Sequence, residues 1–335
     1  MMAAHTWPRD AEQGELLVDG RPSVLFAVVA GVALGLVTGG ARPAPTGRGS
    51  GRSAARGRLA LRAALLVVMG VLLWMLPSGI AIILDAYGVM FLLLVPLLFA
   101  GRGLLAAVAV GLLIAAPLVR DRVVELTGLG PTGPLALGDD PGAVLVDWLL
   151  TGYYPALLWL PLLLAGLLCA RAGLGSRRVQ LLMLGLGAAA CLAGYGAAAV
   201  LPGVDAEAHS GSTAELLGAG GLAIAIIGAA LLALDGPTTS RAAQLVAAPL
   251  TALGRVALTV YVAHVLVIAA LAPLGPAGRF DAAVGIPLLI GLSLGGIALG
   301  LALQAIGRRG PLEWLLSTLA GLPFRHRDPG ARLSA

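Results

Sequence analysis

Charged residues are scarce in this sequence, and lysine is absent. Only 12% of its 335 residues are charged, and all 22 basic residues are arginine. A soluble globular chain is typically about 25% charged, whereas this chain has a mean hydropathy of +0.95. These values exclude a soluble domain of appreciable size and predict an integral membrane protein.

Cysteine is nearly absent as well. The two cysteines, Cys169 and Cys191, both fall within apolar stretches, so we expect small core residues and no disulfide framework. No Cys/His set has the spacing of a metal site, and the G-x-S-x-G, H-E-x-x-H and P-loop motifs are missing. We therefore expect no metal and find no sequence support for hydrolase or ATP chemistry.

Long apolar runs are abundant, and they predict an all-α polytopic membrane protein with about nine transmembrane helices in a single bundle. Each run can cross roughly 30 Å of hydrocarbon. The first run is not a signal peptide, because the segment before it is net negative. We expect spans at residues 22–40, 59–77, 83–100, 103–119, 151–170, 179–201, 215–234, 247–271 and 283–306.

Arginine occurs in every second connection between these spans, which predicts the orientation of the chain. The connection 41–58 is rich in arginine, glycine and proline, whereas "GDDPGAVLVD" and "GVDAEAHSGS" carry acidic residues. Because arginine-bearing loops stay in the cytoplasm, we place residues 1–21 outside and the tail 307–335 inside. The bundle 22–306 then crosses the inner (plasma) membrane. Loop arginine of this kind reflects topology, so we expect the lipid bilayer and no nucleic acid as a partner.

The stretch "AAHTWPRD" near the N-terminus is typical of the outer end of a transmembrane helix. Small apolar residues are followed by a histidine, a tryptophan and a polar exit. A leading helix is the simplest way to carry such a segment across the membrane. We therefore expect a tenth span before residue 1, with His5 at its outer end.

Ionisable side chains inside spans cost roughly 2.5–3.5 kcal/mol at the bilayer centre, so each is a candidate site. Tyr261 and His264 share one helix face in the outer half of the span 247–271. His264 is either a buried histidine bonded to a neighbouring helix or a general base in an outward cavity. Arg255 is either a snorkelling anchor or a phosphate contact for a cytoplasmic cofactor. On a straight helix it lies roughly 13 Å below His264, so the two suit only the ends of a long ligand.

The segment "HSGSTAELL" predicts a helix start. Ser212 and Glu215 form a capping box, S-x-x-E, at the beginning of the span 215–234. This gives Glu215 a structural role. His209 is then an exposed loop residue or a residue at the rim of a cavity.

Three other features have local interpretations. Arg21 lies on the outer side against the positive-inside bias, so it is a candidate anion contact. Asp85 is expected in the first turn of a helix, where a carboxylate is favoured. Gly31 and Gly35, in "GVALG", form a GxxxG pair that predicts close helix packing.

Six blocks carry a resemblance to a known family. They are "DGRPSVLFAVVAGVALGL", "LDAYGVMFLLLVPLL", "GYYPALLWLPLLLAGLLCAR", "HSGSTAELLGAGGLAIAIIGAALL", "LGRVALTVYVAHVLVI" and "RRGPLEWLL". In this order they resemble the YeiB-like family of unknown function (DUF418), from about residue 3 to residue 316. They are also similar to bacterial relatives of heparan-alpha-glucosaminide N-acetyltransferase. Both groups are placed in one superfamily of transmembrane acyltransferases.

The resemblance implies an activity and residue roles. Such proteins are thought to pass an acyl group from cytoplasmic acyl-CoA to a sugar hydroxyl or amine outside. His5 matches the histidine that ends the first helix of acyltransferase relatives, where it is taken as the catalytic base. His264 matches the histidine of the "LT-x-Y-x-x-H" block, and Arg255 matches the basic residue before it. The Arg-Gly pair of the family's first helix has no counterpart here.

Two functions from different classes follow. The first is an acyl-CoA-dependent acyltransferase of the cell envelope, acting on an extracytoplasmic glycan or lipid-linked acceptor. Either His5 or His264 is its base, and Arg255 or the arginine-rich loop binds the cofactor phosphates. Arg21, Tyr261 and His209 are its candidate substrate contacts. The alternative is a solute or lipid-intermediate transporter with a histidine relay, or a catalytically inactive relative.

Overall fold

The computed structural model describes residues 1–8, 20–43, 51–138, 140–234, 241–275 and 280–322. The described residues form helices and contain no strand, which confirms the all-α prediction. Most of the predicted outer segment 1–21, much of the loop 41–58 and the end of the tail lie outside these ranges.

The helices are α1 (Met2–Thr6), α3 (Arg21–Val37), α4 (Arg52–Trp74), α5 (Leu84–Leu94), α6 (Arg102–Thr127), α7 (Pro141–Val146), α8 (Ala156–Ala172), α9 (Arg177–Val200), α10 (Thr213–Leu234), α11 (Arg241–Arg255), α12 (Ala257–Ala270), α13 (Ala282–Ala305) and α14 (Pro311–Gly321). Short helical turns are η1 (Pro134–Leu137), η2 (Asp147–Thr151) and η3 (Ala272–Leu274).

The lengths of the helices support a polytopic membrane protein. Among the described residues, five helices are long and apolar enough to cross a membrane, namely α4, α6, α9, α10 and α13. Two bent helix pairs raise this number to seven if each pair forms one span. Of these helices, α9, α10 and α13 match their predicted spans within two residues, whereas α6 continues eight residues beyond the predicted span 103–119.

Two predicted spans are shorter helices in the structure. In place of the span 22–40, α3 has 17 residues, and in place of the span 83–100, α5 has 11. The chain leaves the helical conformation after α3 at Gly39 and Gly40, which both have positive φ angles. After α5 the chain reaches Pro96, which has no N–H to continue a helix.

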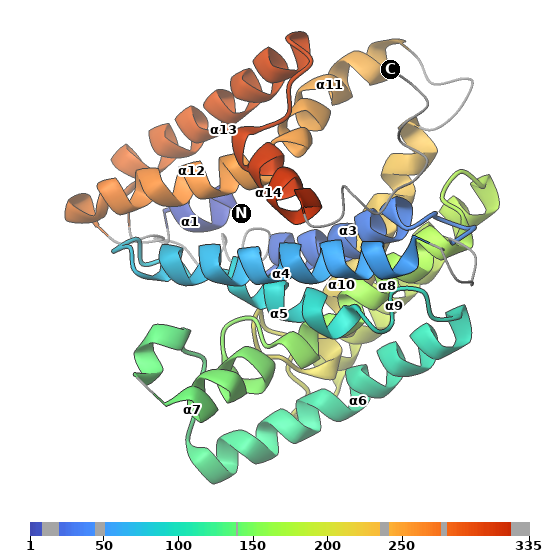
Figure 1. Ribbon diagram of the computed structural model, residues 1–335. Helices are drawn as coiled ribbons and strands as arrows, with labels where there is room; N and C mark the ends of the chain where they lie inside the picture. The colour runs from blue at the N-terminus through green and yellow to red at the C-terminus, as the bar shows by residue number, and fades with distance from the viewer. Residues whose placement is uncertain (9–19, 44–50, 139, 235–240, 276–279, 323–335) are drawn as a thin grey trace.

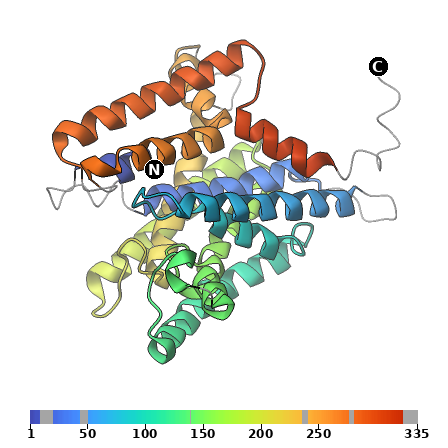
Figure 2. The same ribbon diagram turned by 60° about the vertical axis from the view of Figure 1, so that its left-hand side comes forward.

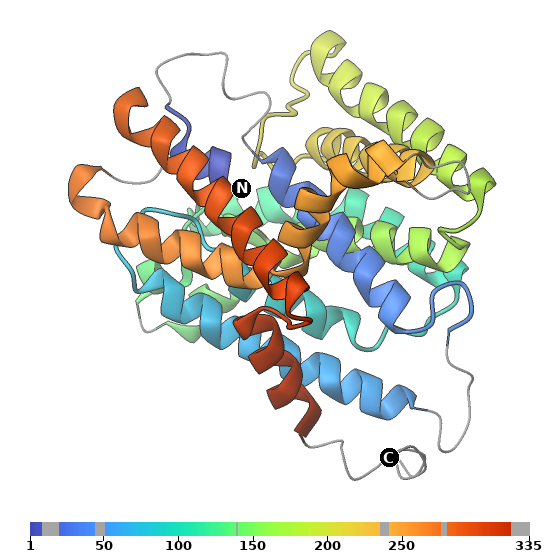
Figure 3. The ribbon, with the colours of Figure 1, turned by 90° about the horizontal axis from the view of Figure 1, so that it is seen from above.

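The helices are arranged in three groups. In Figure 1, α11 to α14 lie above α4, whereas α6 and α7 lie below it, and Figure 2 shows the same order. The middle group contains α3, α5, α8 and α10, and α9 packs on α10 at the edge of the molecule. Seen from above in Figure 3, α14 lies beside α4. The helix α14 was not predicted, because it occupies part of the segment interpreted as the tail 307–335. Similarly, α4 begins at Arg52, seven residues before the predicted span.

Glycine residues bring the central helices α3 and α8 into backbone contact. A Cβ atom at Gly31 would overlap the carbonyl oxygen of Leu163, and one at Gly166 would overlap that of Val28. A Cβ atom at Gly35 would overlap the Cβ atom of Ala170. The packing role predicted for Gly31 and Gly35 is therefore confirmed.

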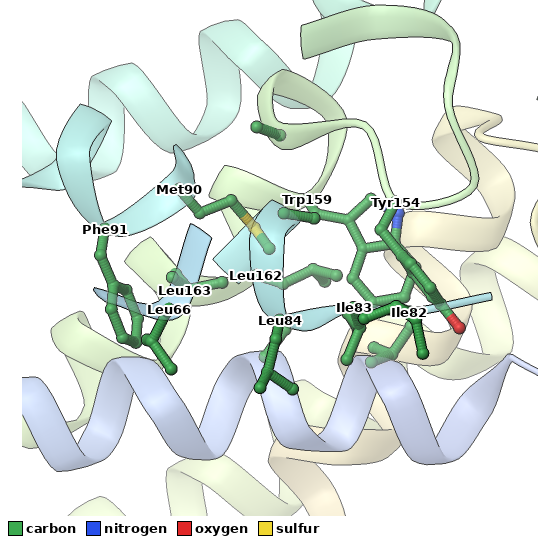
Figure 4. Packing of buried hydrophobic residues seen from close by; sticks show 14 of the residues in the cluster. Leu66, Ile82, Ile83, Leu84, Met90, Phe91, Tyr154, Trp159, Leu162 and Leu163 are labelled. Atoms are coloured by element: carbon green, nitrogen blue, oxygen red, sulfur yellow. The ribbon is translucent and has the colours of Figure 1, made fainter. Parts of the chain in front are cut away.

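Large apolar side chains lie both inside and on the outside of the bundle. Figure 4 shows Tyr154 and Trp159 packed beside Ile82 and Ile83 in the central core. On the outer surface, Leu118, Leu186 and Leu192 are 66%, 66% and 74% exposed. Exposed apolar surface on this scale is expected where helices face lipid.

Candidate functional site

Two histidines from distant parts of the chain meet inside the bundle. The Nδ1 atom of His5, in α1, lies 3.0 Å from the Nε2 atom of His264, in α12. The two rings are inclined by only 1°, and their centroids are 5.2 Å apart. A short N···N distance between parallel, laterally displaced rings is the geometry of a hydrogen bond in the ring plane. The N–H of one imidazole therefore donates a hydrogen bond to the ring nitrogen of the other, and the tautomers decide which ring is the donor.

Tyr261 packs beside this histidine pair, as its place on the same helix face predicts. Its ring meets the ring of His264 edge-on, with centroids 5.1 Å apart. Its hydroxyl oxygen accepts a hydrogen bond of 3.3 Å from the backbone N–H of Ile83, just before α5. His264 is 1% exposed and Tyr261 is 9% exposed. Tyr261 therefore holds α12 against the start of α5 and fixes the ring of His264.

The other half of the pair is positioned by helix packing. Thr6, next to His5, is fully buried, and its hydroxyl donates to the carbonyl oxygen of Met2. The carbonyl oxygen of Thr6 lies where a Cβ atom of Gly285 would be. The backbones of α1 and α13 therefore touch at this point, and any larger residue at position 285 would displace His5.

Arg255 is not part of this cluster. The predicted span 247–271 is broken between α11 and α12, with a bend of 72°. Arg255 is the last residue of α11 and is exposed. The expectation of one straight helix, with Arg255 about 13 Å below His264, is therefore wrong.

His209 belongs to a second polar cluster that stands before α10. Its backbone N–H donates to Oε1 of Glu215 at 2.6 Å, and the N–H of Gly211 donates to Oε2 at 2.7 Å. The backbone N–H of Glu215 donates to Ser212 Oγ at 2.9 Å, which is the predicted half of the capping box. The carboxylate, however, binds the loop 209–211 instead of the Ser212 backbone, so the expected capping box is only half formed.

The ring of His209 is enclosed by aromatic side chains. It lies nearly parallel to Trp159, with centroids 6.2 Å apart, and edge-on to Tyr154 at 5.4 Å. His209 also has a positive φ angle of 64°, which is uncommon for a non-glycine residue. Its backbone is therefore held in a special conformation by Glu215, and its side chain is half-buried, not the exposed loop residue of one prediction.

Arg21 lies close to this second cluster. The preceding residue, Gly20, touches Ala208, and a Cβ atom at Gly20 would lie 3.7 Å from Nε2 of His209. The Nε–H of Arg21 donates to the hydroxyl oxygen of Tyr195 at 3.2 Å, and the guanidinium lies 5.2 Å from the centre of that ring. The predicted anion contact is thus next to His209 and is oriented by an aromatic ring of α9.

Tyr154 connects the two clusters. It contacts His209 directly, and it packs in the same core cluster as Ile83, whose backbone N–H donates to the hydroxyl oxygen of Tyr261 beside His264. The structure therefore gathers His5, His264, Tyr261, His209 and Arg21 around one part of the core, as members or neighbours. The connecting position of Tyr154 was not predicted from the sequence.

A cavity of about 440 Å³ lies between α3, α4, α5 and α14. Its lining is mostly apolar, and its polar side chains are those of Thr38, Arg58, Arg62 and Ser317. The guanidinium of Arg62 interacts electrostatically with Glu313. Arg62 precedes the C-terminal end of α4, at Trp74, by 12 residues, or ~18 Å, and Arg58 lies about one turn further away. The cavity therefore lies toward the end of α4 that is remote from Trp74.

Arg171 lies between the predicted spans 151–170 and 179–201, but it is 2% exposed. Its guanidinium donates to the carbonyl oxygens of Gly35, Gly40 and Leu98 at 3.1, 2.8 and 3.0 Å, and to Thr38 Oγ1 at 2.7 Å. These acceptors lie at the end of α3 and after α5. Arg171 therefore closes the C-terminal end of α3 and ties it to α8, a structural role.

Comparison with known proteins gives one match. The sequence model of a family described as "Protein of unknown function (DUF418)" matches residues 170–322. The matched segment contains Tyr261 and His264 and runs from the end of α8 through α14. This agrees with the resemblance stated from the sequence blocks. Neither the curated proteins nor the solved structures gave a match.

Proposed function

We propose that this chain, whose residues 170–322 match the DUF418 family model, is a membrane-embedded acyltransferase. It moves an acyl group, in the simplest case acetyl, from cytoplasmic acyl-CoA to an extracytoplasmic sugar or lipid-linked acceptor. The observation that carries this proposal is the hydrogen bond between His5 and His264 in the apolar interior. Ionisable side chains inside a membrane protein mark functional sites.

The histidine pair supplies what acyl transfer needs. A neutral imidazole removes the proton of the acceptor hydroxyl or amine as its oxygen or nitrogen attacks the thioester carbonyl. The C–S bond then breaks, and the CoA thiolate takes the proton from the imidazolium. A second imidazole in the ring plane stabilises the positive charge by accepting a hydrogen bond, as the third group of a catalytic triad does.

Different burial of the two histidines supports different roles for them. His264 is almost fully buried, and its Nε2 faces His5. His5 is half-buried in a short helix. We therefore assign the base to His5 and a positioning role to His264, with Tyr261 fixing the orientation of His264.

The cavity with Arg58 and Arg62 supports the cofactor half of the proposal. Guanidinium groups bind phosphate well, and the apolar remainder of the cavity, including Phe91 and Leu98, suits an acyl-pantetheine arm. By the positive-inside rule this end of α4 faces the cytoplasm. Of the two predicted phosphate sites, this one is therefore favoured over the exposed Arg255.

The acceptor half rests on the second cluster. His209, Arg21 and the aromatic rings around them combine hydrogen-bonding groups with flat apolar faces. Such a combination suits a sugar or a lipid-linked sugar phosphate. Tyr154 places this cluster next to Tyr261 and hence next to the histidine pair.

The test is transfer of a label from the acyl group of acyl-CoA in membranes that contain the protein. We expect label in a lipid or glycan fraction with the wild type and a loss of 10²–10⁴-fold with His5→Ala. His5→Ala should leave the amount of folded protein unchanged. Arg177→Gln, which removes an exposed arginine, is the control and should transfer label normally. If acyl-CoA donors of several acyl lengths all leave the lipid and glycan fractions unlabelled, the proposal is contradicted.

A further inference from the structure

Two carboxylates that the proposed mechanism does not use lie buried near the end of α4. Asp85 is in the first turn of α5, and Asp147 begins η2. Each is 2% exposed. Both line one small cavity of about 10 Å³, together with Thr132. That volume holds about one water molecule or one small ion.

Asp85 is held by two tryptophans. Its Oδ2 atom accepts hydrogen bonds from the indole Nε1–H groups of Trp74 at 3.2 Å and Trp148 at 2.9 Å. Its Oδ1 atom is fully buried and has no hydrogen-bond partner among the described residues. The indoles therefore fix the carboxylate in a single orientation and leave one oxygen available to the cavity.

Asp147 is fixed on the other side. Its Oδ1 atom accepts a hydrogen bond of 2.9 Å from the hydroxyl of Thr132. Asp85 and Asp147 repel each other electrostatically. No arginine in the described ranges forms an ion pair with either carboxylate. Thr132 and Asp147 come from different segments of the chain, so their hydrogen bond is not part of a local helix cap.

Two carboxylates buried without a counter-charge are costly, and such groups are usually paired or bind a cation. Carboxylate and hydroxyl oxygens are the ligands of hard cations. The described residues hold no group of three or more His, Cys, Asp and Glu side chains that could hold a metal ion, which leaves a small cation bound by two carboxylates and a hydroxyl. The cavity is also too small for an organic ammonium group.

We propose that Asp85, Asp147 and Thr132 form a binding site for one small monovalent cation of the size of Na⁺. The ion sits between the two carboxylates, with Asp85 Oδ1 as one ligand. Trp74 and Trp148 orient this ligand from behind. The proposal uses neither His5 nor His264, so it stands or falls without the acyltransferase proposal.

The indole contacts provide a direct signal. Purified protein is titrated with NaCl against N-methylglucamine chloride at constant ionic strength, and its tryptophan fluorescence and thermal unfolding midpoint are followed. We expect a saturable fluorescence change and a higher midpoint with Na⁺. Asp85→Asn and Asp147→Asn should each raise the half-saturating Na⁺ concentration at least tenfold. Asp121→Asn, a change at an exposed carboxylate of α6, should leave the titration unchanged.

Three outcomes would overturn the proposal. The first is a wild-type protein with no Na⁺-dependent change, which needs no variant to be decisive. The second is a Na⁺ response that survives in both Asn variants. The third is a response to acid alone, with no competition from Na⁺, which would mean that the two carboxylates share a proton.

Discussion

The guanidinium of Arg171 donates a hydrogen bond of 2.8 Å to the carbonyl oxygen of Gly40, beyond the end of α3. The same side chain also binds Gly35, Thr38 and Leu98. One buried arginine thus closes a helix terminus and joins it to two other segments.

Replacing Arg171 should therefore destabilise the protein strongly. Arg171→Met removes the donors and leaves several buried carbonyl groups unsatisfied, a loss of about 3 kcal/mol or more. We expect the thermal unfolding midpoint in detergent to fall by roughly 5–10 °C. Arg178→Met, at an exposed position of α9, should shift it little. Equal midpoints for the two variants would mean that the network contributes no stability.

The close contact between α3 and α8 predicts that a glycine-to-alanine substitution there lowers the stability, whereas the same substitution at an open position does not. Gly31→Ala places a Cβ atom against the carbonyl oxygen of Leu163, so it should destabilise by about 1–3 kcal/mol. Gly111→Ala, in α6, meets no atom within 4 Å and should be neutral or stabilising, by up to about 1 kcal/mol. The thermal unfolding midpoints of the two variants measure this difference in stability. Equal midpoints would mean that α3 and α8 are not closely packed at Gly31.

The role of His264 can be separated from a purely structural role. His264→Gln keeps an amide that can bond to His5, whereas His264→Leu does not. We expect the leucine variant to lose at least about 10²-fold in kcat, with a small change in the KM for acyl-CoA. The glutamine variant should recover part of kcat and show a displaced pH profile. Equal kcat values for the two variants would argue against positioning through this hydrogen bond.

The cofactor cavity predicts which arginines affect acyl-CoA binding. Arg58→Gln and Arg62→Gln should each raise the KM for acyl-CoA about tenfold, because each removes a charge-assisted phosphate contact. Arg255→Gln should have little effect. Kinetics at two salt concentrations provide the measurement, since phosphate contacts weaken with ionic strength. A larger effect of Arg255→Gln would instead move the phosphate site to the end of α11.

Sequence periodicity predicted the regular part of this fold well. The spans 179–201 and 283–306 correspond to α9 and α13 within two residues, because long apolar runs leave a helix as the only satisfied backbone conformation in lipid. The Gly31–Gly35 packing was also readable, since small residues four positions apart lie on one face of a helix.

The break in the span 247–271 was not readable, because a distant residue stabilises it. The N–H of Thr259, in the first turn of α12, donates to Oε1 of Glu313 in α14 at 3.0 Å. No local side chain caps α12. A carboxylate more than fifty positions away therefore satisfies a new helix start that the local sequence does not signal.

The candidate site could also be predicted only in part from the sequence. His5, His264 and Tyr261 were identified singly as candidate residues, because ionisable groups in apolar segments are rare. Their assembly depends on the packing of α1, α12 and α13, which no spacing in the sequence specifies. Asp147 was overlooked because it stands in a segment read as a connection, and its neighbour Asp85 comes from another helix.

The distance along the chain between the two histidines has a consequence for biosynthesis. His5 and His264 are 259 positions apart, so the ribosome must make most of the protein before they can meet. The first turn of α12 needs Glu313, which is made later still. The histidine site can therefore form only after α12 and α14 have been made, and a ribosome that stalls before residue 313 leaves a chain in which the start of α12 lacks this contact.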